Sequence, residues 1–398
     1  MIGRSGFLLP GFLGALAFLF FVYGFSVESS GRWQQQRRDN WAVLLCTSRY
    51  YYNYRHYVNA LSMYKVLKDG GFRDDRIIFL NTEDEVTCDA RNPYPGFVLS
   101  DLLPSTEELQ KTYGSMDSGF QSHVFFNTSV TSDEKHSCGG PDRVEVDYVG
   151  DEVSVDAFLR LFDGRVNSWT ELSKRLESTS MSNVFVYMTG HGGDEFFKFH
   201  DTRELTARDL AAAITEMYEK ERFREMLMMI DTCQAATMCN HIDVPGVYCI
   251  GGSRIGENSY AYEPKRKLGL PVTDRFTLHV TRYLQREVVK NLSSNSNSKT
   301  KKSITDLMHS MDTKFLYSTP LLMEPIAGSR HPDHVALADF FTPAIQEYKD
   351  TPWSGSSICS EYNVNSTTRT CHSYDFSEFY EEGKSIESTS INIYNSNS

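Results

Sequence analysis

The chain has 398 residues, of which 40% are hydrophobic and 13% aromatic. This composition supplies enough apolar side chains for a sizeable core, and the length suits a single α/β domain with insertions and a tail. The formal net charge at pH 7 is −12, and no dense block of Lys and Arg occurs. The charge pattern therefore argues against nucleic acid as a partner.

The N-terminal segment, residues 1–26, has the pattern of a secretory leader. Arg4 precedes an apolar run over residues 7–25, which is typical of a signal peptide, with Gly24-Phe25-Ser26 as a cleavage site. The run is also long enough to span a bilayer as an uncleaved anchor. Under either alternative we expect the body of the chain to enter the secretory pathway. No later run is long and apolar enough to cross a membrane, so we expect no C-terminal anchor.

Sequons and cysteines agree with this destination. Sequons for N-glycosylation begin at Asn127, Asn291 and Asn365. Among the eight cysteines, Cys46 and Cys249 lie in apolar runs and are predicted to be buried thiols. Cys359 and Cys371 bracket a short polar loop and are candidates for a disulfide. The sequence contains no CxxC, which disfavours a zinc ribbon or a redox motif.

From Trp41 onward, short apolar runs alternate with helical patterns. We predict strands at residues 41–47, 77–80, 184–188, 226–230 and 247–250. We predict helices at residues 53–68, 206–219 and 276–289, the second with Thr206 as its N-cap. Because each strand is almost entirely apolar, the pattern favours an α/β fold with a mostly parallel sheet and helices on both faces.

Composition separates a body from less regular segments. The body spans residues 40–345. A polar, irregular insertion is predicted at about residues 104–141, and a low-complexity linker at residues 291–302. Residues 349–398 are rich in Ser, Asn, Thr and acidic side chains, so we predict a flexible tail there.

Two reactive side chains each follow the end of a predicted strand. His191 lies in Thr189-Gly190-His191-Gly192-Gly193, and Cys233 lies in Asp231-Thr232-Cys233-Gln234-Ala235. Ligands of open α/β sheets bind beyond the carboxyl ends of the strands. If these two strands are neighbours, the thiol and the imidazole face one cleft, and the glycines around His191 present bare N–H groups that can stabilise an oxyanion.

A Cys–His pair predicts nucleophilic catalysis. A thiol is mostly neutral at pH 7, and a nearby imidazole can take its proton, so that the thiolate attacks a carbonyl and forms a thioester. The same imidazole then returns the proton to the departing amine. The structural alternative is a buried cysteine that only packs and a histidine that only stabilises a turn. Cys239, His200 and His241 are weaker candidates because they do not follow a strand end.

A set of short stretches forms a recognisable combination. These stretches are Asn40-Trp41-Ala42-Val43-Leu44, Cys46-Thr47-Ser48-Arg49, Asn53-Tyr54-Arg55-His56, Arg91-Asn92-Pro93, Val144-Glu145-Val146-Asp147-Tyr148, Tyr187-Met188-Thr189-Gly190-His191-Gly192-Gly193 and Ile230-Asp231-Thr232-Cys233-Gln234. Together they resemble the family of glycosylphosphatidylinositol (GPI) transamidase catalytic subunits, in the caspase-like and legumain-like clan of cysteine peptidases. The resemblance covers roughly residues 40–341 and implies a caspase-like fold.

This resemblance implies a reaction and its residues. Cys233 attacks the attachment-site carbonyl of a precursor protein and releases its C-terminal signal, and the ethanolamine amine of a GPI lipid then resolves the thioester. The N–H groups of Gly192 and Cys233 form the oxyanion hole. Asn53 orients His191, where the alternative is a helix cap, and Ser253 helps to shape the substrate cleft. The chemistry needs no cofactor.

The resemblance also implies partners. Cys88 is expected to form a disulfide with another subunit of a membrane-bound complex in the endoplasmic reticulum, with Cys138 as a competing candidate for that bond. Either partner subunits or an uncleaved N-terminal segment then holds the chain at the membrane.

A structural calcium site is the remaining expectation from the family. Its oxygen ligands correspond to Asp74, the Ile77 carbonyl, Glu145 and Asp147. The alternative is a solvated acidic patch.

Two other functions remain open at this point. A legumain-like endopeptidase shares the Cys–His pair but uses water in place of the amine. A non-catalytic scaffold has the same fold without activity, although the intact His191 and Cys233 argue against it.

Overall fold

The computed structural model describes residues 39–82, 89–92, 97–100, 124–127, 144–266, 268–290 and 301–342. The chain divides into two units, Met1–Ile345 and Gln346–Ser398, and every described residue belongs to the first. The predictions for the N-terminal leader, for the tail and for Cys88 and Cys138 lie outside the described residues. So do those for the linker over residues 291–300 and for Cys359 and Cys371. Within the described part, no helix combines the length and apolar character needed to cross a membrane.

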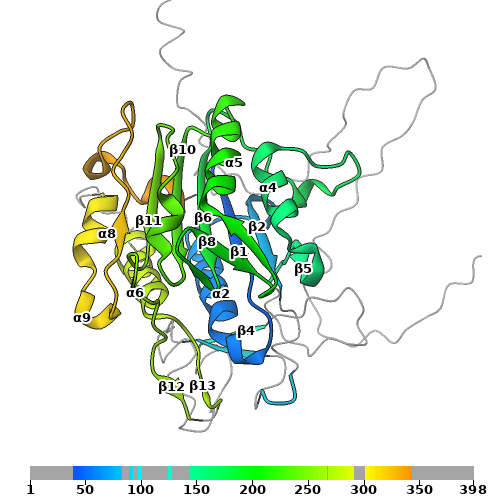
Figure 1. The fold of residues 1–398 in the computed structure, drawn as a ribbon, viewed down its shortest axis with the longest axis vertical. Coiled ribbons are helices and arrows are strands. Elements are labelled where there is room, and N and C mark those ends of the chain that lie inside the picture. Colours follow the sequence, from blue (N-terminus) through cyan, green and yellow to red (C-terminus); the bar gives the residue numbers. More distant parts are fainter. Residues whose placement is uncertain are drawn as a thin grey trace, which may run out of the picture. The chain divides into compact units, whose positions relative to one another are not determined.

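A seven-stranded sheet forms the centre of the described body (Figure 1). In spatial order its strands are β14 (Leu321–Leu322), β11 (Val247–Gly251), β10 (Glu225–Asp231), β6 (Asn183–Thr189), β1 (Trp41–Cys46), β2 (Ile77–Asn81) and β5 (Tyr148–Val149). Every neighbouring pair is parallel except β14 with β11. The five predicted strands therefore all form, and they are the five central members of the sheet.

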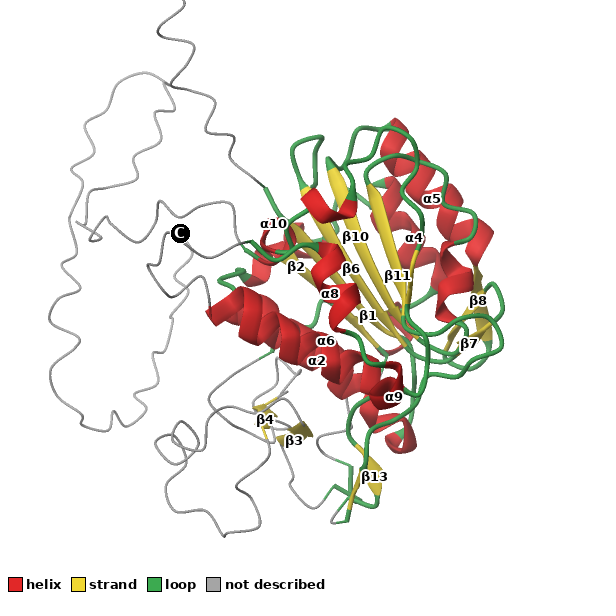
Figure 2. Cartoon of the chain, turned by 90° about the vertical axis from the view of Figure 1, so that its left-hand side faces the viewer, coloured by secondary structure: helices red, strands yellow, loops and turns green. Residues whose placement is uncertain are grey.

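Helices cover both faces of this sheet, as Figure 2 shows. One face carries α2 (Tyr54–Asp69), α6 (Arg275–Leu284), α8 (Ile304–Ser310) and α10 (Ala338–Phe341). The other face carries α4 (Val155–Asp163) and α5 (Ala207–Glu219). The side chain of Thr206 accepts a hydrogen bond from the Asp209 N–H, as predicted for an N-cap.

Strand β1 shows why helices must pack on both faces of the sheet. Successive side chains of a strand point to opposite faces, so Ala42 and Leu44 join the core beneath α2, whereas Trp41 and Val43 join the core beneath α4 and α5. All four side chains are almost fully buried. Burial of a large apolar side chain contributes about 1.5–3 kcal/mol, which neither face could gain if it were left in water. The predicted α/β class is confirmed.

The remaining elements are short. They are β3 (Phe97–Ser100) with β4 (Val124–Asn127), β7 (Gly192–Gly193) with β8 (Phe196–Phe199) and β9 (Arg203–Thr206), β12 (Pro264–Lys265) with β13 (Leu270–Pro271), and α9 (Thr313–Leu316). Strand β4 lies inside the segment predicted to be irregular, 104–141. The predicted helix at residues 276–289 is α6 followed by a π-helical turn over Gln285–Val289.

Candidate active site

The loops that carry His191 and Cys233 leave adjacent strands at the same edge of the sheet. Thr189 of β6 and Asp231 of β10 are directly paired, and the Gly190 N–H donates to the Asp231 carbonyl at 3.4 Å. Each reactive residue lies two positions beyond this pair, and both side chains are partly exposed. Because β6 and β10 are neighbouring strands (Figure 1), the structure brings the predicted nucleophile and base to one edge of the sheet.

The glycines beside His191 serve close packing. A Cβ on Gly190 would stand 2.4 Å from Thr47 Oγ1, and one on Gly192 would stand 2.7 Å from the Phe196 carbonyl oxygen. Neither glycine has a positive φ. The sequence analysis considered these glycines only for their bare N–H groups, and the structure adds that neighbouring atoms leave no room for a side chain at either position.

Hydrogen bonds fix the loop that carries the nucleophile. Gln234, directly after Cys233, has a left-handed conformation with φ of 53°, and its N–H donates to the Glu257 carbonyl at 2.9 Å. The fully buried Ser253 hydroxyl donates to the Thr232 carbonyl at 2.8 Å and accepts from the Ala235 N–H at 3.1 Å. These bonds set the direction in which the backbone passes Cys233.

Both predicted oxyanion donors belong to peptide units that are already hydrogen-bonded on their carbonyl side. The His191 carbonyl, in the unit that ends in the Gly192 N–H, accepts from the Lys198 N–H at 2.8 Å. The Thr232 carbonyl, in the unit that ends in the Cys233 N–H, accepts from Ser253. A hydrogen bond at one end of a peptide unit polarises the donor at its other end. Both N–H groups are thus prepared to bind negative charge.

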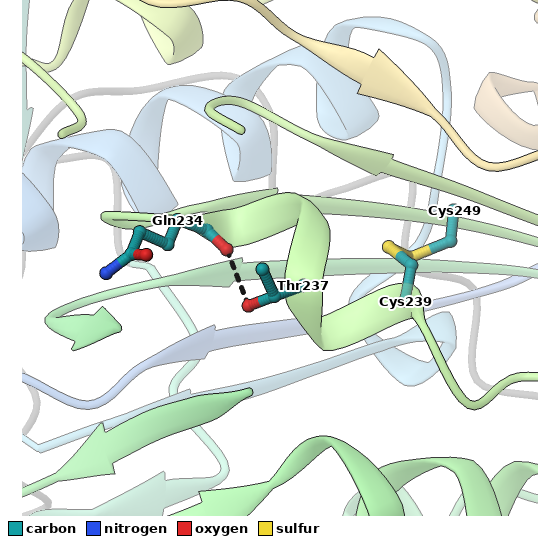
Figure 3. Close-up of a disulfide and its surroundings, with 4 residues drawn as sticks. All are labelled: Gln234, Thr237, Cys239 and Cys249. Atoms are coloured by element: carbon teal, nitrogen blue, oxygen red, sulfur yellow. Dashed lines mark hydrogen bonds between the residues drawn. A yellow bond between two sulfur atoms is a disulfide. The ribbon is translucent and has the colours of Figure 1, made fainter. Parts of the chain in front are cut away.

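A disulfide anchors the helical turn after the nucleophile. This turn, η5 (Ala235–Cys239), ends at Cys239, which is bonded to Cys249 in the middle of β11 (Figure 3). The Thr237 hydroxyl donates to the Gln234 carbonyl at 2.8 Å in the same turn. The prediction of a buried thiol at Cys249 is therefore wrong: the side chain is buried as expected, but η5 packs on β11 and brings Cys239 to it. The disulfide also removes Cys239 as a candidate nucleophile.

Asn53 holds the imidazole of His191. The Asn53 Oδ1 lies 2.9 Å from His191 Nε2, while its Nδ2 donates to the Arg49 carbonyl at 2.7 Å. Because the carbonyl oxygen of the amide faces the ring, Nε2 carries the proton of the neutral imidazole, and Nδ1 keeps a lone pair that can accept a proton. Asn53 precedes α2 but makes no side-chain cap bond, so the helix-cap alternative does not describe its contacts.

A buried group of charged and polar side chains lies behind His191. The His56 ring packs edge-on against the His191 ring, with centroids 4.8 Å apart, and the Arg55 guanidinium pairs with Asp274 at 3.0 Å. Burial, followed by the positive charge of Arg55, lowers the pKa of His191. At neutral pH the ring is therefore uncharged and able to act as a base.

Asp231 and Asp274 are two buried carboxyl groups beneath the site. Ser259 Oγ donates to Asp231 at 2.6 Å, the Thr277 N–H donates to it at 3.2 Å, and the Asn59 amide donates to Asp274 at 2.6 Å. Burial and the neighbouring Asp274 raise the pKa of Asp231. The bond from Thr277 ties the end of β10 to α6 and so restrains the strand that leads into Cys233.

Sequence reasoning missed most of this support. None of the matching stretches contains Asp274, Asn59 or Ser259. Only the folded chain brings these residues close to Asp231 and His191. Arg55 and His56 were within a matching stretch, but their position beside His191 had no signal in spacing.

The other candidate histidines lie elsewhere. His200 Nε2 is 2.5 Å from the Val153 carbonyl, and His241 pairs with Glu195 at 3.0 Å. Ser253, expected to shape the substrate cleft, has no exposed surface and uses its hydroxyl within the nucleophile loop.

The residues expected to bind calcium cluster near the start of β2. Asp147 is 5% exposed and accepts from the Phe79 N–H at 2.9 Å. Burial, with the charges of Glu145 and Asp74, raises the pKa of Asp147 to about 7. Lys68 pairs with Asp74 at 2.7 Å. In the described ranges no group of three or more His, Cys, Asp or Glu side chains is arranged to hold a metal ion.

A parallel α/β sheet whose adjacent strands end in a His loop and a Cys loop defines a hydrolase or transferase with a cysteine nucleophile. Residues 40–319 match the model of the peptidase C13 family. The chain belongs to the peptidase C13 family.

Within this family, the chain is similar to several curated GPI-anchor transamidases. The GPI-anchor transamidase of Schizosaccharomyces pombe is 36% identical over 77% of this chain and 70% of its own length. The GPI-anchor transamidases of Saccharomyces cerevisiae and Homo sapiens are 37% and 36% identical over 76% of this chain. The matched regions cover 64% and 66% of those two proteins, so the chain spans about two thirds of their length. The resemblance inferred from the sequence motifs is confirmed.

A solved structure of caspase-1 from Spodoptera frugiperda also matches. It is 9% identical and covers 73% of this chain and 88% of its own, with a TM-score of 0.33. A likeness of this size adds nothing to the assignment of the site.

The charge of Arg55 should be visible in the pH dependence of activity. In Arg55→Gln, the positive charge that disfavours protonated His191 is lost and Asp274 loses its partner, so the pKa of His191 rises. We expect the acid limb of kcat/KM to move to higher pH by roughly half a unit. Arg203→Gln, at an exposed position of β9, is the control and should leave the limb in place. An acid limb that stays fixed or moves to lower pH in Arg55→Gln contradicts this assignment.

Loss of the disulfide should reduce both stability and activity. Cys239 and Cys249 are separated by 10 residues, and closing a ring of this size stabilises a fold by about 2–3 kcal/mol. The double variant Cys239→Ser, Cys249→Ser should lose that amount in urea unfolding and should show a lower kcat because η5 is released. Mild reductant should reproduce the effect in the unaltered chain and should change the double variant much less. Equal stability with and without the bond would show that η5 is held by packing alone.

Proposed function

We propose that this chain is the catalytic subunit of a GPI-anchor transamidase. The observation that carries the proposal is the strand register, which places His191 and Cys233 at matching positions beyond the paired Thr189 and Asp231. The names of the curated relatives supply the reaction. Cys233 cleaves a C-terminal signal from a precursor protein, and the protein is transferred to the ethanolamine amine of a GPI lipid.

The first half of the reaction forms a thioester. His191 Nδ1 accepts the thiol proton of Cys233, and the sulfur attacks the carbonyl carbon at the attachment site. The resulting oxyanion lies against the N–H groups of Gly192 and Cys233. As the intermediate collapses, the C–N bond breaks, and His191 gives its proton to the departing amine of the signal peptide.

The second half repeats these steps with a different amine. The ethanolamine nitrogen attacks the thioester carbonyl and loses a proton to His191, and the C–S bond breaks as the thiolate leaves. Asn53 keeps Nε2 protonated throughout, so the same nitrogen, Nδ1, serves as base and as acid in both halves. The only difference from a peptidase is whether an amine or water attacks the thioester.

The partners follow from this reaction. The substrates are precursor proteins with C-terminal signals and a GPI lipid, both of which are delivered at a membrane. We place the chain on the lumenal side of the endoplasmic reticulum, in a complex whose other subunits hold it at the membrane. Cys88 is the proposed point of a disulfide to one of these subunits.

Product identity separates a transamidase from an endopeptidase. The full-length chain in its membrane complex, given a precursor peptide and hydroxylamine, should release the signal peptide and form a hydroxamate. Cys233→Ala and His191→Ala should lose product formation by at least about a thousandfold, because each removes one half of the proton-coupled attack. His241→Ala, the matched histidine control, should retain activity. Only free acid as product indicates a legumain-like hydrolase, and full activity in Cys233→Ala indicates a different nucleophile.

A calcium ion is proposed to bind through Asp147, Glu145 and the Ile77 carbonyl, with Asp74 exchanging its Lys68 partner for the ion. Binding requires ionised Asp147, whose pKa is raised to about 7. Added Ca²⁺ should therefore raise the melting temperature of the full-length chain more at pH 8 than at pH 6. In Asp147→Asn, which still accepts from the Phe79 N–H, the rise should disappear. If Ca²⁺ does not raise the melting temperature of the unaltered chain at pH 8, these residues form an acidic patch that does not bind the ion.

A further inference from the structure

Thr232 connects the two loops of the site. It directly precedes Cys233, and its side chain is 1% exposed. Its Oγ1 and Cγ2 would stand 2.8 Å and 3.1 Å from a Cβ placed on Gly192. Thr232 therefore joins the two predicted oxyanion donors: it is the chain neighbour of Cys233, which supplies one, and it lies against Gly192, which supplies the other.

The hydroxyl of Thr232 has no hydrogen-bond partner within the described part of the chain. Its surroundings are otherwise satisfied, since the Thr232 carbonyl accepts from Ser253 and the Gln234 N–H donates to the Glu257 carbonyl. A buried hydroxyl without a partner lowers stability. Valine has nearly the same shape and would fill the space without that cost. An unpartnered hydroxyl beside a reactive cysteine is explained if it forms a hydrogen bond during the reaction.

We infer that Thr232 is a positioning residue of the oxyanion hole. Its Oγ1 is the Thr232 atom nearest the Gly192 Cβ position, so the hydroxyl lies against that backbone beside the Cys233 amide. The hydroxyl gains a hydrogen bond when the tetrahedral intermediate draws the two amides onto the oxyanion. The inference rests on the proposed thioester chemistry of Cys233. It assigns Thr232 to the transition state and not to substrate binding or to the reactivity of the thiol.

The test separates oxyanion formation from thiol reactivity on the full-length chain. In Thr232→Val we expect kcat to fall about tenfold, with KM unchanged. A peptide aldehyde, which forms a tetrahedral adduct with an oxyanion, should bind about tenfold more weakly. Alkylation of Cys233 by iodoacetamide, which forms no oxyanion, should keep its rate. The melting temperature should stay equal or rise, since a buried unpartnered hydroxyl has been removed.

Two further variants complete the test. Thr232→Ser keeps the hydroxyl and should retain most of kcat and of the aldehyde affinity. Ser178→Ala removes another buried hydroxyl that lacks a partner in the described residues, and it should leave kcat, the aldehyde affinity and the alkylation rate unchanged. Unaltered kcat and aldehyde affinity in Thr232→Val overturn the inference, and so does a parallel loss of the alkylation rate. If the unaltered chain neither binds the aldehyde nor is alkylated at Cys233, the proposed function fails instead.

Discussion

The parallel pairing of β6 with β10 is the constraint on which the site depends. Side chains two residues beyond a paired position on neighbouring parallel strands leave the sheet at the same edge and at the same level. Thr189 and Asp231 are such a pair, and a slip of one residue would move one reactive side chain relative to the other and turn a buried face towards solvent. The apolar cores on both sides of the sheet make that slip costly, so the register that stabilises the fold also sets the geometry of the chemistry.

Around this register, each backbone segment of the site is held by a group from a distant part of the chain. Asn53, at the start of α2, orients the base; Ser253, after β11, fixes the nucleophile loop; Asp231 is tied to α6 through Thr277. None of these helpers is exposed by more than a few per cent. The site is therefore rigid because its supports are buried, while the two reactive side chains remain partly open to solvent.

The central strands and the two reactive residues could be predicted because their signal is local. An apolar run of five to seven residues followed by a glycine-rich or Asp-Thr-Cys turn carries its information within ten positions. The small three-stranded sheet of β7, β8 and β9 could not be predicted this way. Its apolar residues Phe197, Phe199 and Leu205 alternate over too few positions to be distinguished from a loop. The Cys239–Cys249 bond was missed for a different reason: both cysteines lie in apolar surroundings, and only the packing of η5 on β11 shows that they meet.

That bond has a consequence for how the sequence can vary. The segment between Cys239 and β11 is fastened at both of its ends, one by sulfur and one by the sheet. Between these two anchors, His241 also pairs with Glu195, and the Gly246 carbonyl accepts from the Met226 N–H. A change at an exposed position of this ring, such as Asp243, is therefore separated from the reacting centre by a covalent anchor.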